Sequence, residues 1–152
     1  MKKIAIVGNI GSGKSYIAKL FKLPVFNADD EVIQLYKNNK KIFRKLKKAI
    51  PKFIESFPIN KSELAQSILS NKKNLKKISE IVHPEIRRKM KNFIEKNNKK
   101  RAVILDIPLF LENKLNNKTH TLIFIDAQKN IIKKKLLKRK NFNKKLFDLL
   151  KE

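Results

Sequence analysis

The chain of 152 residues contains no cysteine, no tryptophan and only three glycines. The absence of cysteine excludes a disulfide framework and any cysteine-ligated metal site. No apolar run approaches the roughly 20 residues that a membrane-spanning helix needs. The apolar run near the N-terminus, residues 4–7, is also too short for a signal peptide. We therefore expect a globular cytoplasmic protein with no membrane partner, acting as a monomer or a weak homo-oligomer.

Acidic residues are also scarce, because 13 Asp and Glu stand against 38 Lys and Arg, which gives a net charge of +25. Only five of these 38 basic residues are arginine, the better bidentate partner for phosphates and bases. The lysines are spread along the chain, so we interpret most of the charge as solvated helix faces and codon bias. We expect attraction for small anions and no specific nucleic acid partner; salt-dependent, non-specific nucleic-acid binding is the alternative.

All three glycines lie in one stretch, GNIGSGKSY at residues 8–16. The stretch matches G-x-x-x-x-G-K-[ST], follows an apolar strand pattern and opens a helical pattern, as a phosphate-binding loop does. Glycine lets backbone N–H groups approach phosphate oxygens, and the helix N-terminus favours an anion. The stretch predicts a nucleoside triphosphate site, and the alternative is a glycine-rich turn with a surface lysine. The expected nucleotide-binding residues are Gly8, Asn9, Ile10, Gly11, Ser12, Gly13, Lys14, Ser15 and Tyr16.

Within this loop, Lys14 is expected to bridge the terminal phosphates, and the Ser15 hydroxyl to bind Mg²⁺. The loop alone does not distinguish kinases, GTPases and mechanical ATPases. The segment after the last apolar strand, FIDAQKN, contains no guanine-reading N-K-x-D, which argues against a GTPase. Small proteins of this kind that carry a helical insertion are usually phosphoryl transferases acting on small molecules, by analogy of fold.

Short apolar runs separated by helical patterns predict an α/β fold: a parallel sheet of about four strands flanked by helices. The strands are expected within residues 3–7, 23–26, 101–108 and 119–127, and helices over 14–21, 62–69, 74–82 and 84–96. We expect a nucleotide-binding core of residues 1–37 and 101–135, a helical substrate-binding insertion of 38–100, and a lid helix of 136–152. The Lys- and Asn-rich runs at 37–41 and 97–101 are the expected hinges.

Three consecutive carboxylates follow the second expected strand: Asp29, Asp30 and Glu31. Ligands bind at the carboxyl edge of a parallel sheet, so Asp29 is a candidate base for the acceptor hydroxyl. Its alternative role is to cap a helix over residues 30–35. Asp106 ends the third strand and could support Mg²⁺ or simply cap a loop.

Several segments in order resemble the dephospho-coenzyme A kinase family. GNIGSGKS is similar to the family's G-G-I-G-S-G-K-S loop, FNADDEV to its D-A-D segment, and the helical region through VHPEI to its HP region. ILDIPLFLEN is similar to its D-x-P-L-L-F-E element, and IDAQKNIIKKKLLKRKN to its last strand and lid helix. The resemblance implies the P-loop kinase fold and ATP- and Mg²⁺-dependent phosphorylation of the ribose 3′-hydroxyl of dephospho-CoA, the last step of coenzyme A biosynthesis.

By this resemblance Asp29 matches the second acid of D-A-D, the catalytic base, and Arg139 matches a lid arginine that reaches the transferred phosphate. Lys61 and the pair His83–Pro84 match substrate-binding positions, although the pair alone also reads as a turn between two helices.

Two departures from the family pattern stand out. Asn27 replaces the first acid of D-A-D, and the chain stops within what reads as a shortened lid helix. The alternatives that stay open are a kinase for another small metabolite or nucleoside monophosphate, and an inactive, truncated nucleotide-binding remnant.

Overall fold

The computed structural model describes residues 1–107, 120–128, 130, 132–133, 137 and 144–145. The elements in chain order are β1 (Lys2–Val7), α1 (Lys14–Leu20), β2 (Val25–Asn27), α2 (Ala28–Asn38), α3 (Lys40–Ala49), α4 (Lys61–Ser70), α5 (Lys73–Lys96), β3 (Ala102–Asp106) and β4 (His120–Phe124). The chain divides into two compact units, one made of described residues within 1–29 and 89–140, the other of those within 30–88 and 141–152. Each unit is described by itself.

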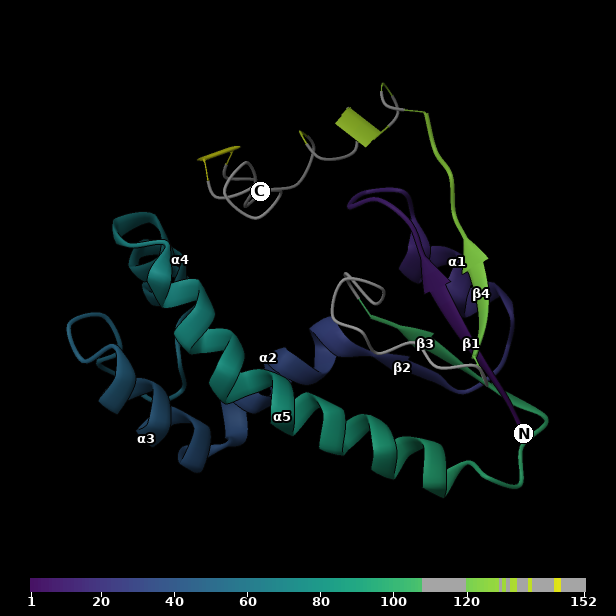
Figure 1. Cartoon of the computed structure of the whole chain (residues 1–152), viewed down its shortest axis with the longest axis horizontal. Helices are drawn as coiled ribbons and strands as arrows, with labels where there is room; N and C mark the ends of the chain where they lie inside the picture. The colour runs from purple at the N-terminus through teal and green to yellow at the C-terminus, as the bar shows by residue number, and fades with distance from the viewer. Residues whose placement is uncertain (108–119, 129, 131, 134–136, 138–143, 146–152) are drawn as a thin grey trace. The chain divides into compact units, whose positions relative to one another are not determined.

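The first unit is built on a four-stranded sheet with the order β2-β3-β1-β4 (Figure 1). All three strand pairings are parallel, so the predicted sheet of four parallel strands is confirmed. β2 begins directly after Pro24, whose carbonyl accepts a 2.9 Å hydrogen bond from the Ile104 amide. The proline therefore stands at the strand's start, where its missing N–H costs no ladder bond.

Helices cover both faces of this sheet. Ile6 and Ile104 pack with Ala18 of α1 in a fully buried cluster on one face. Phe26 points to the opposite face from its neighbour Val25, because side chains alternate along a strand. There its ring lies 5.6 Å from the ring of Phe93 in the C-terminal part of α5. Continuous apolar runs such as AVILD, buried at all five positions of β3, are what a sheet covered on both faces requires.

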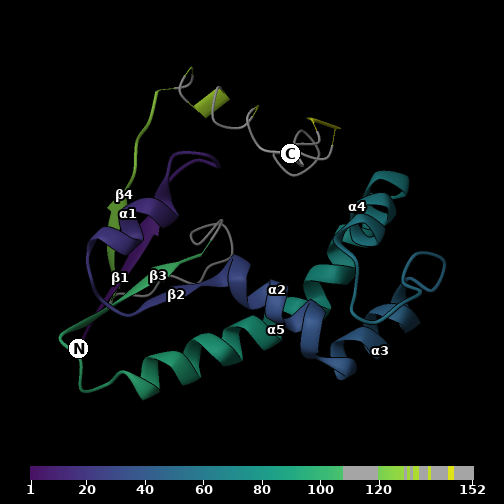
Figure 2. The ribbon, with the colours of Figure 1, turned by 180° about the vertical axis from the view of Figure 1, so that it is seen from behind.

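The second unit is helical, with α3, α4 and the first part of α5 (Figure 2). Ile42 and Leu46, one helical turn apart, are the buried residues of α3. The Asn74 amide donates a 2.9 Å bond to the buried Ser67 carbonyl and so joins α5 to α4. The helical character predicted for residues 38–100 is thus observed, and α4 matches the expected helix over 62–69.

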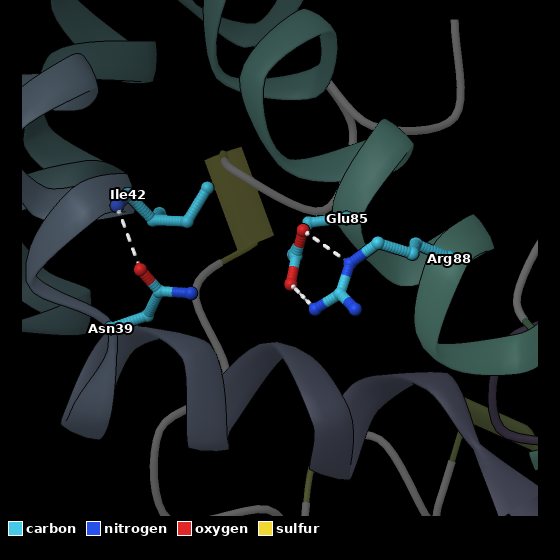
Figure 3. Close-up of polar contacts among 4 residues, drawn as sticks. All are labelled: Asn39, Ile42, Glu85 and Arg88. Atoms are coloured by element: carbon cyan, nitrogen blue, oxygen red, sulfur yellow. Dashed lines mark hydrogen bonds and ion pairs between the residues drawn. The ribbon is translucent and has the colours of Figure 1, made fainter. Parts of the chain in front are cut away.

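The expected hinge at residues 37–41 contains the break between two helices, because α2 runs to Asn38 and α3 starts at Lys40. Motion at this break stays a prediction. Asn39 alone separates the two helices, and its side chain accepts a 3.0 Å bond from the Ile42 amide as the N-cap of α3 (Figure 3).

The predicted position of Pro84 is wrong. We expected it in the first turn of a separate helix, but it lies inside the single continuous helix α5. Val82 and Ile86, two residues before and two residues after Pro84, are both buried, and their packing keeps the helix intact. Near it the Arg88 guanidinium donates two bonds to the Glu85 carboxylate, one of them from Nε at 3.1 Å (Figure 3). Among the described residues no helix is both long and apolar enough to cross a bilayer.

Candidate active site

The phosphate loop occupies the turn between β1 and α1, as its sequence predicts. All three glycines have positive φ angles: 143° at Gly8, 87° at Gly11 and 97° at Gly13. Residues other than glycine rarely adopt these angles, so the backbone path itself explains why the glycines are gathered here. The loop is tightened by a 3.1 Å bond from the Ser12 amide to the Asn9 carbonyl.

Gly8 is also required for lack of space. A Cβ atom at this position would collide with the carbonyl oxygen of Ile125, just after β4, and would come within 3.2 Å of the Ser12 hydroxyl oxygen. That hydroxyl is itself notable, because Ser12 is only 6% exposed and its Oγ has no hydrogen-bond partner among the described residues. A buried hydroxyl without a partner costs free energy, and a phosphate oxygen in the loop would satisfy it.

The start of α1 offers further donors. Its N-cap, Gly13, makes no side-chain capping bond, and the first intrahelical bonds are donated by the amides of Tyr16 and Ile17 to the Gly13 carbonyl. The amides of Lys14 and Ser15, the first two helical residues, precede this first turn and have no carbonyl within the helix to donate to. The helix end therefore presents N–H groups and a partial positive charge, the requirements of an anion site.

The Lys14 side chain folds back along the loop. Its ammonium nitrogen lies 2.8 Å from the Gly8 carbonyl oxygen and 2.9 Å from that of Asn9. An ammonium held above the loop's concave backbone is the group expected to meet the terminal phosphates of a nucleotide.

Asp106 and Asn27 meet at the carboxyl edge of the sheet. The two residues are register partners at the ends of β3 and β2, and Ile6 of β1 pairs with Asp106 on its other side. The Asn27 amide donates a 2.9 Å hydrogen bond to Oδ2 of Asp106, which is only 3% exposed. The bond between these residues has no signature in the sequence, because only the strand register brings them together.

Asp29 follows two residues after Asn27 and is exposed. It lies in the first turn of α2, which begins at Ala28, so the prediction that Asp29 caps a helix starting at Asp30 is wrong. A carboxylate in the first turn is still favoured by the helix dipole. Asp29 thus stands just beyond the carboxyl end of β2, at the sheet edge where the phosphate loop also begins.

These residues fit a bound ATP–Mg²⁺. The glycine cradle, the unpartnered Ser12 hydroxyl and the Lys14 ammonium suit phosphate oxygens, and the Ser15 hydroxyl is exposed at the helix start. The described residues hold no group of three or more His, Asp or Glu side chains suited to a metal. That fits Mg²⁺, which is usually held by few protein ligands together with the substrate's phosphates.

The remaining candidates belong to the second unit. Lys61 is exposed at the start of α4, and His83 and Pro84 lie in the middle of α5. The alternative reading of His83 as a cap between two helices is wrong, because the helix is continuous. Burial and the positive charge of Arg87 lower the pKa of His83 below its usual value. Arg139 and most of the expected lid, residues 136–152, lie outside the described residues.

Comparisons with known proteins identify one family. The family model described as dephospho-CoA kinase matches residues 2–148. The dephospho-CoA kinase of Bartonella quintana is 34% identical over 99% of this chain and 79% of its own length. That of Wolbachia sp. subsp. Brugia malayi is 34% identical over 97% of this chain and 77% of its own length.

Solved structures show the same fold. A crystal structure from Thermus thermophilus superposes with a TM-score of 0.73 at 27% identity, covering 99% of this chain and 77% of that one. A dephospho-CoA kinase from Campylobacter jejuni superposes with a TM-score of 0.62 at 21% identity, over 99% of this chain and 78% of that one. The expected P-loop kinase fold and the family resemblance are both confirmed: the chain belongs to the dephospho-CoA kinase family.

Proposed function

We propose that the chain transfers the γ-phosphate of ATP to the ribose 3′-hydroxyl of dephospho-CoA and so produces coenzyme A. Family membership gives the reaction, with ATP as the phosphate donor. The observation on this chain that carries the proposal is the phosphate loop, in which three positive-φ glycines, an unpartnered buried hydroxyl and a folded-over lysine converge.

In the proposed reaction the 3′-oxygen of the acceptor attacks the γ-phosphorus in line with the bond to the β,γ-bridging oxygen. The new O–P bond forms as the bridging bond breaks, and ADP leaves. Asp29 accepts the proton of the attacking hydroxyl, a role supported by its place just after β2, at the same carboxyl edge of the sheet as the phosphate loop. Lys14 moves from the Gly8 and Asn9 carbonyls to the phosphates and offsets their charge in the transition state.

The Ser15 hydroxyl and the Asp106 carboxylate would hold Mg²⁺, which when bound neutralises charge on the β- and γ-phosphate oxygens. A carboxylate as buried as that of Asp106 is costly unless something compensates its charge. Among the described residues its side-chain hydrogen-bond partner is the neutral Asn27 amide, so a bound cation would supply a compensating positive charge.

On the acceptor side we propose that Lys61, His83 and Pro84 contribute to dephospho-CoA binding, and that Arg139 reaches the transferred phosphate. One physical feature of the second unit supports this proposal. Its helices α3 to α5 carry many lysines, which attract an acceptor bearing several phosphate charges.

The test is turnover by the purified chain, with ATP and Mg²⁺ and a panel of acceptors. Dephospho-CoA should be phosphorylated, and nucleoside monophosphates should not. Asp29→Asn should remove most of the turnover while leaving ATP binding intact, whereas Asp30→Asn, the matched neutralisation next to it, should change little. Turnover of a nucleoside monophosphate in place of dephospho-CoA would refute the proposed acceptor.

A further inference from the structure

Asn27 and Asp106 form a side-chain pair at the sheet's carboxyl edge, between the edge strand β2 and its neighbour β3. The Asn27 amide nitrogen lies 2.9 Å from Oδ2 of Asp106, and the two residues are partners in the β2–β3 register. On its other side Asp106 pairs with Ile6, two residues before Gly8 opens the phosphate loop. Backbone pairing therefore fixes Asp106 on both sides and Asn27 on one, and the strand next to Asp106 leads into the phosphate loop.

The bond constrains a carboxylate that has little else to hold it. Asp106 is 3% exposed, and within the described part of the chain its hydrogen-bonding side-chain partner is Asn27. An amide engaging Oδ2 fixes the plane of the carboxylate without bringing in a charge. The amide therefore adds no charge beside Asp106 and holds its carboxyl group in one orientation.

We propose that Asn27 is a positioning residue for magnesium: it orients the Asp106 carboxylate so that it meets the ion carried by ATP. The proposal rests on the proposed function, in which Asp106 supports that ion. Partners that orient a metal-binding side chain typically contribute about 10–100-fold in metal affinity or activity. A neutral amide can take this role because it donates a hydrogen bond to the carboxylate.

The first test measures binding without turnover. The affinity of the chain for β,γ-methylene-ATP is measured by calorimetry in excess Mg²⁺ and in EDTA, for the parent and for Asn27→Ala. We expect the gain in affinity that Mg²⁺ gives to fall about tenfold in Asn27→Ala, with the affinity in EDTA unchanged. Asn38→Ala is the matched control, because the Asn38 amide also makes a 2.9 Å bond, to Gln34 in the second unit. It should leave both affinities at the parent values.

The second test asks whether Asn27 acts through Asp106. In turnover, Asn27→Ala should lower kcat and leave KM for dephospho-CoA unchanged. In calorimetry, adding Asn27→Ala to an Asp106→Asn variant should have no further effect on the gain in nucleotide affinity that Mg²⁺ gives. If Asn27→Ala is too unstable to purify, Asn27→Ser keeps a polar group there but is too short to reach the carboxylate. An unchanged Mg²⁺-dependent gain, or additive effects in the double variant, would overturn the proposal. Failure of the proposed function is seen separately, as an inactive parent, and the calorimetric comparison does not depend on it.

Discussion

The ammonium nitrogen of Lys14 lies 2.8 Å from the carbonyl oxygen of Gly8, so the last part of the phosphate loop closes back onto its first residue. Together with the 2.9 Å contact to the Asn9 carbonyl, this places the charge above the loop before any nucleotide arrives. Binding of a triphosphate would exchange two carbonyl dipoles for full negative charges, a stronger partner for an ammonium.

Lys14→Ala should therefore lower kcat about 100-fold or more, the effect of removing one group that stabilises transition-state charge. Lys19→Ala is the matched control, because Lys19 lies exposed on the same helix, α1. Initial rates with saturating ATP and dephospho-CoA check the prediction. The unfolding temperatures of the two variants are measured as well, so that a loss of activity is not mistaken for a loss of folding. A Lys14→Ala variant as active as the control would remove this residue from the mechanism.

Gly8→Ala should destabilise the fold. The substitution places a side chain at a φ of 143° and against the Ile125 carbonyl, with backbone strain costing of order 1–3 kcal/mol before the collision is counted. Thermal unfolding measures it, since each kcal/mol lowers Tm by about 2–4 °C in a chain of this size. An unchanged Tm would mean that the loop follows a different path.

Ser12→Ala, in contrast, should not destabilise the fold. Its buried hydroxyl lacks a partner, so replacing it with a methyl group should leave the free energy of unfolding unchanged or raise it by up to about 1 kcal/mol. ATP affinity should fall in the same variant, because the phosphate loses a donor. A loss of stability without a loss of ATP affinity would show that the hydroxyl is structural.

His83 should make stability depend on pH. Burial and the charge of Arg87 lower the pKa of His83 from its usual 6.5. Below the unfolded-state pKa the unfolded chain binds a proton that the folded chain resists, so the free energy of unfolding falls as the pH falls toward the folded-state pKa. Urea unfolding between about pH 8 and about pH 5 should show this loss, and His83→Gln should remove it. In Arg87→Gln the loss should be smaller, since one cause of the lowered pKa is gone.

Tyr36 should act at the alkaline end. Burial raises its pKa to about 12. Between the usual value of about 10 and that value, the unfolded chain gives up a proton that the folded chain keeps, so stability falls as the pH rises. Absorbance titration should show a late phenolate that Tyr36→Phe lacks. If the parent shows no such late phenolate, the Tyr36 side chain is more accessible than its 8% exposure implies.

The sequence predicts the sheet and the phosphate loop well because their signals are local. Buried parallel strands are continuous apolar runs, as in the β3 sequence AVILD, and the loop needs glycine at fixed spacings. Helix α3 was missed because only Ile42 and Leu46 face inward from a run dominated by lysine. Pro84 was misjudged because proline usually marks a helix start, whereas the packing of α5 keeps it inside the helix.

Candidate site residues can be named from the sequence, but their arrangement cannot. Asp106 and Asn27 are 79 positions apart, and their bond depends on the register of two strands joined through the whole helical unit. The orphan hydroxyl of Ser12 has no sequence signature either, since serine is common in such loops. Long-range pairing and burial are properties of the folded chain, and these are what turn a list of polar residues into a site.

The most direct test of the central claim is to incubate the purified chain with ATP, Mg²⁺ and dephospho-CoA and to locate the new phosphate by ³¹P NMR and mass spectrometry. The account predicts ADP and coenzyme A in equal amounts, with the phosphoryl group on the ribose 3′-oxygen, and product formation about 100-fold slower or more with Lys14→Ala. ATP hydrolysis without a phosphorylated acceptor, or phosphate on another oxygen, would contradict it.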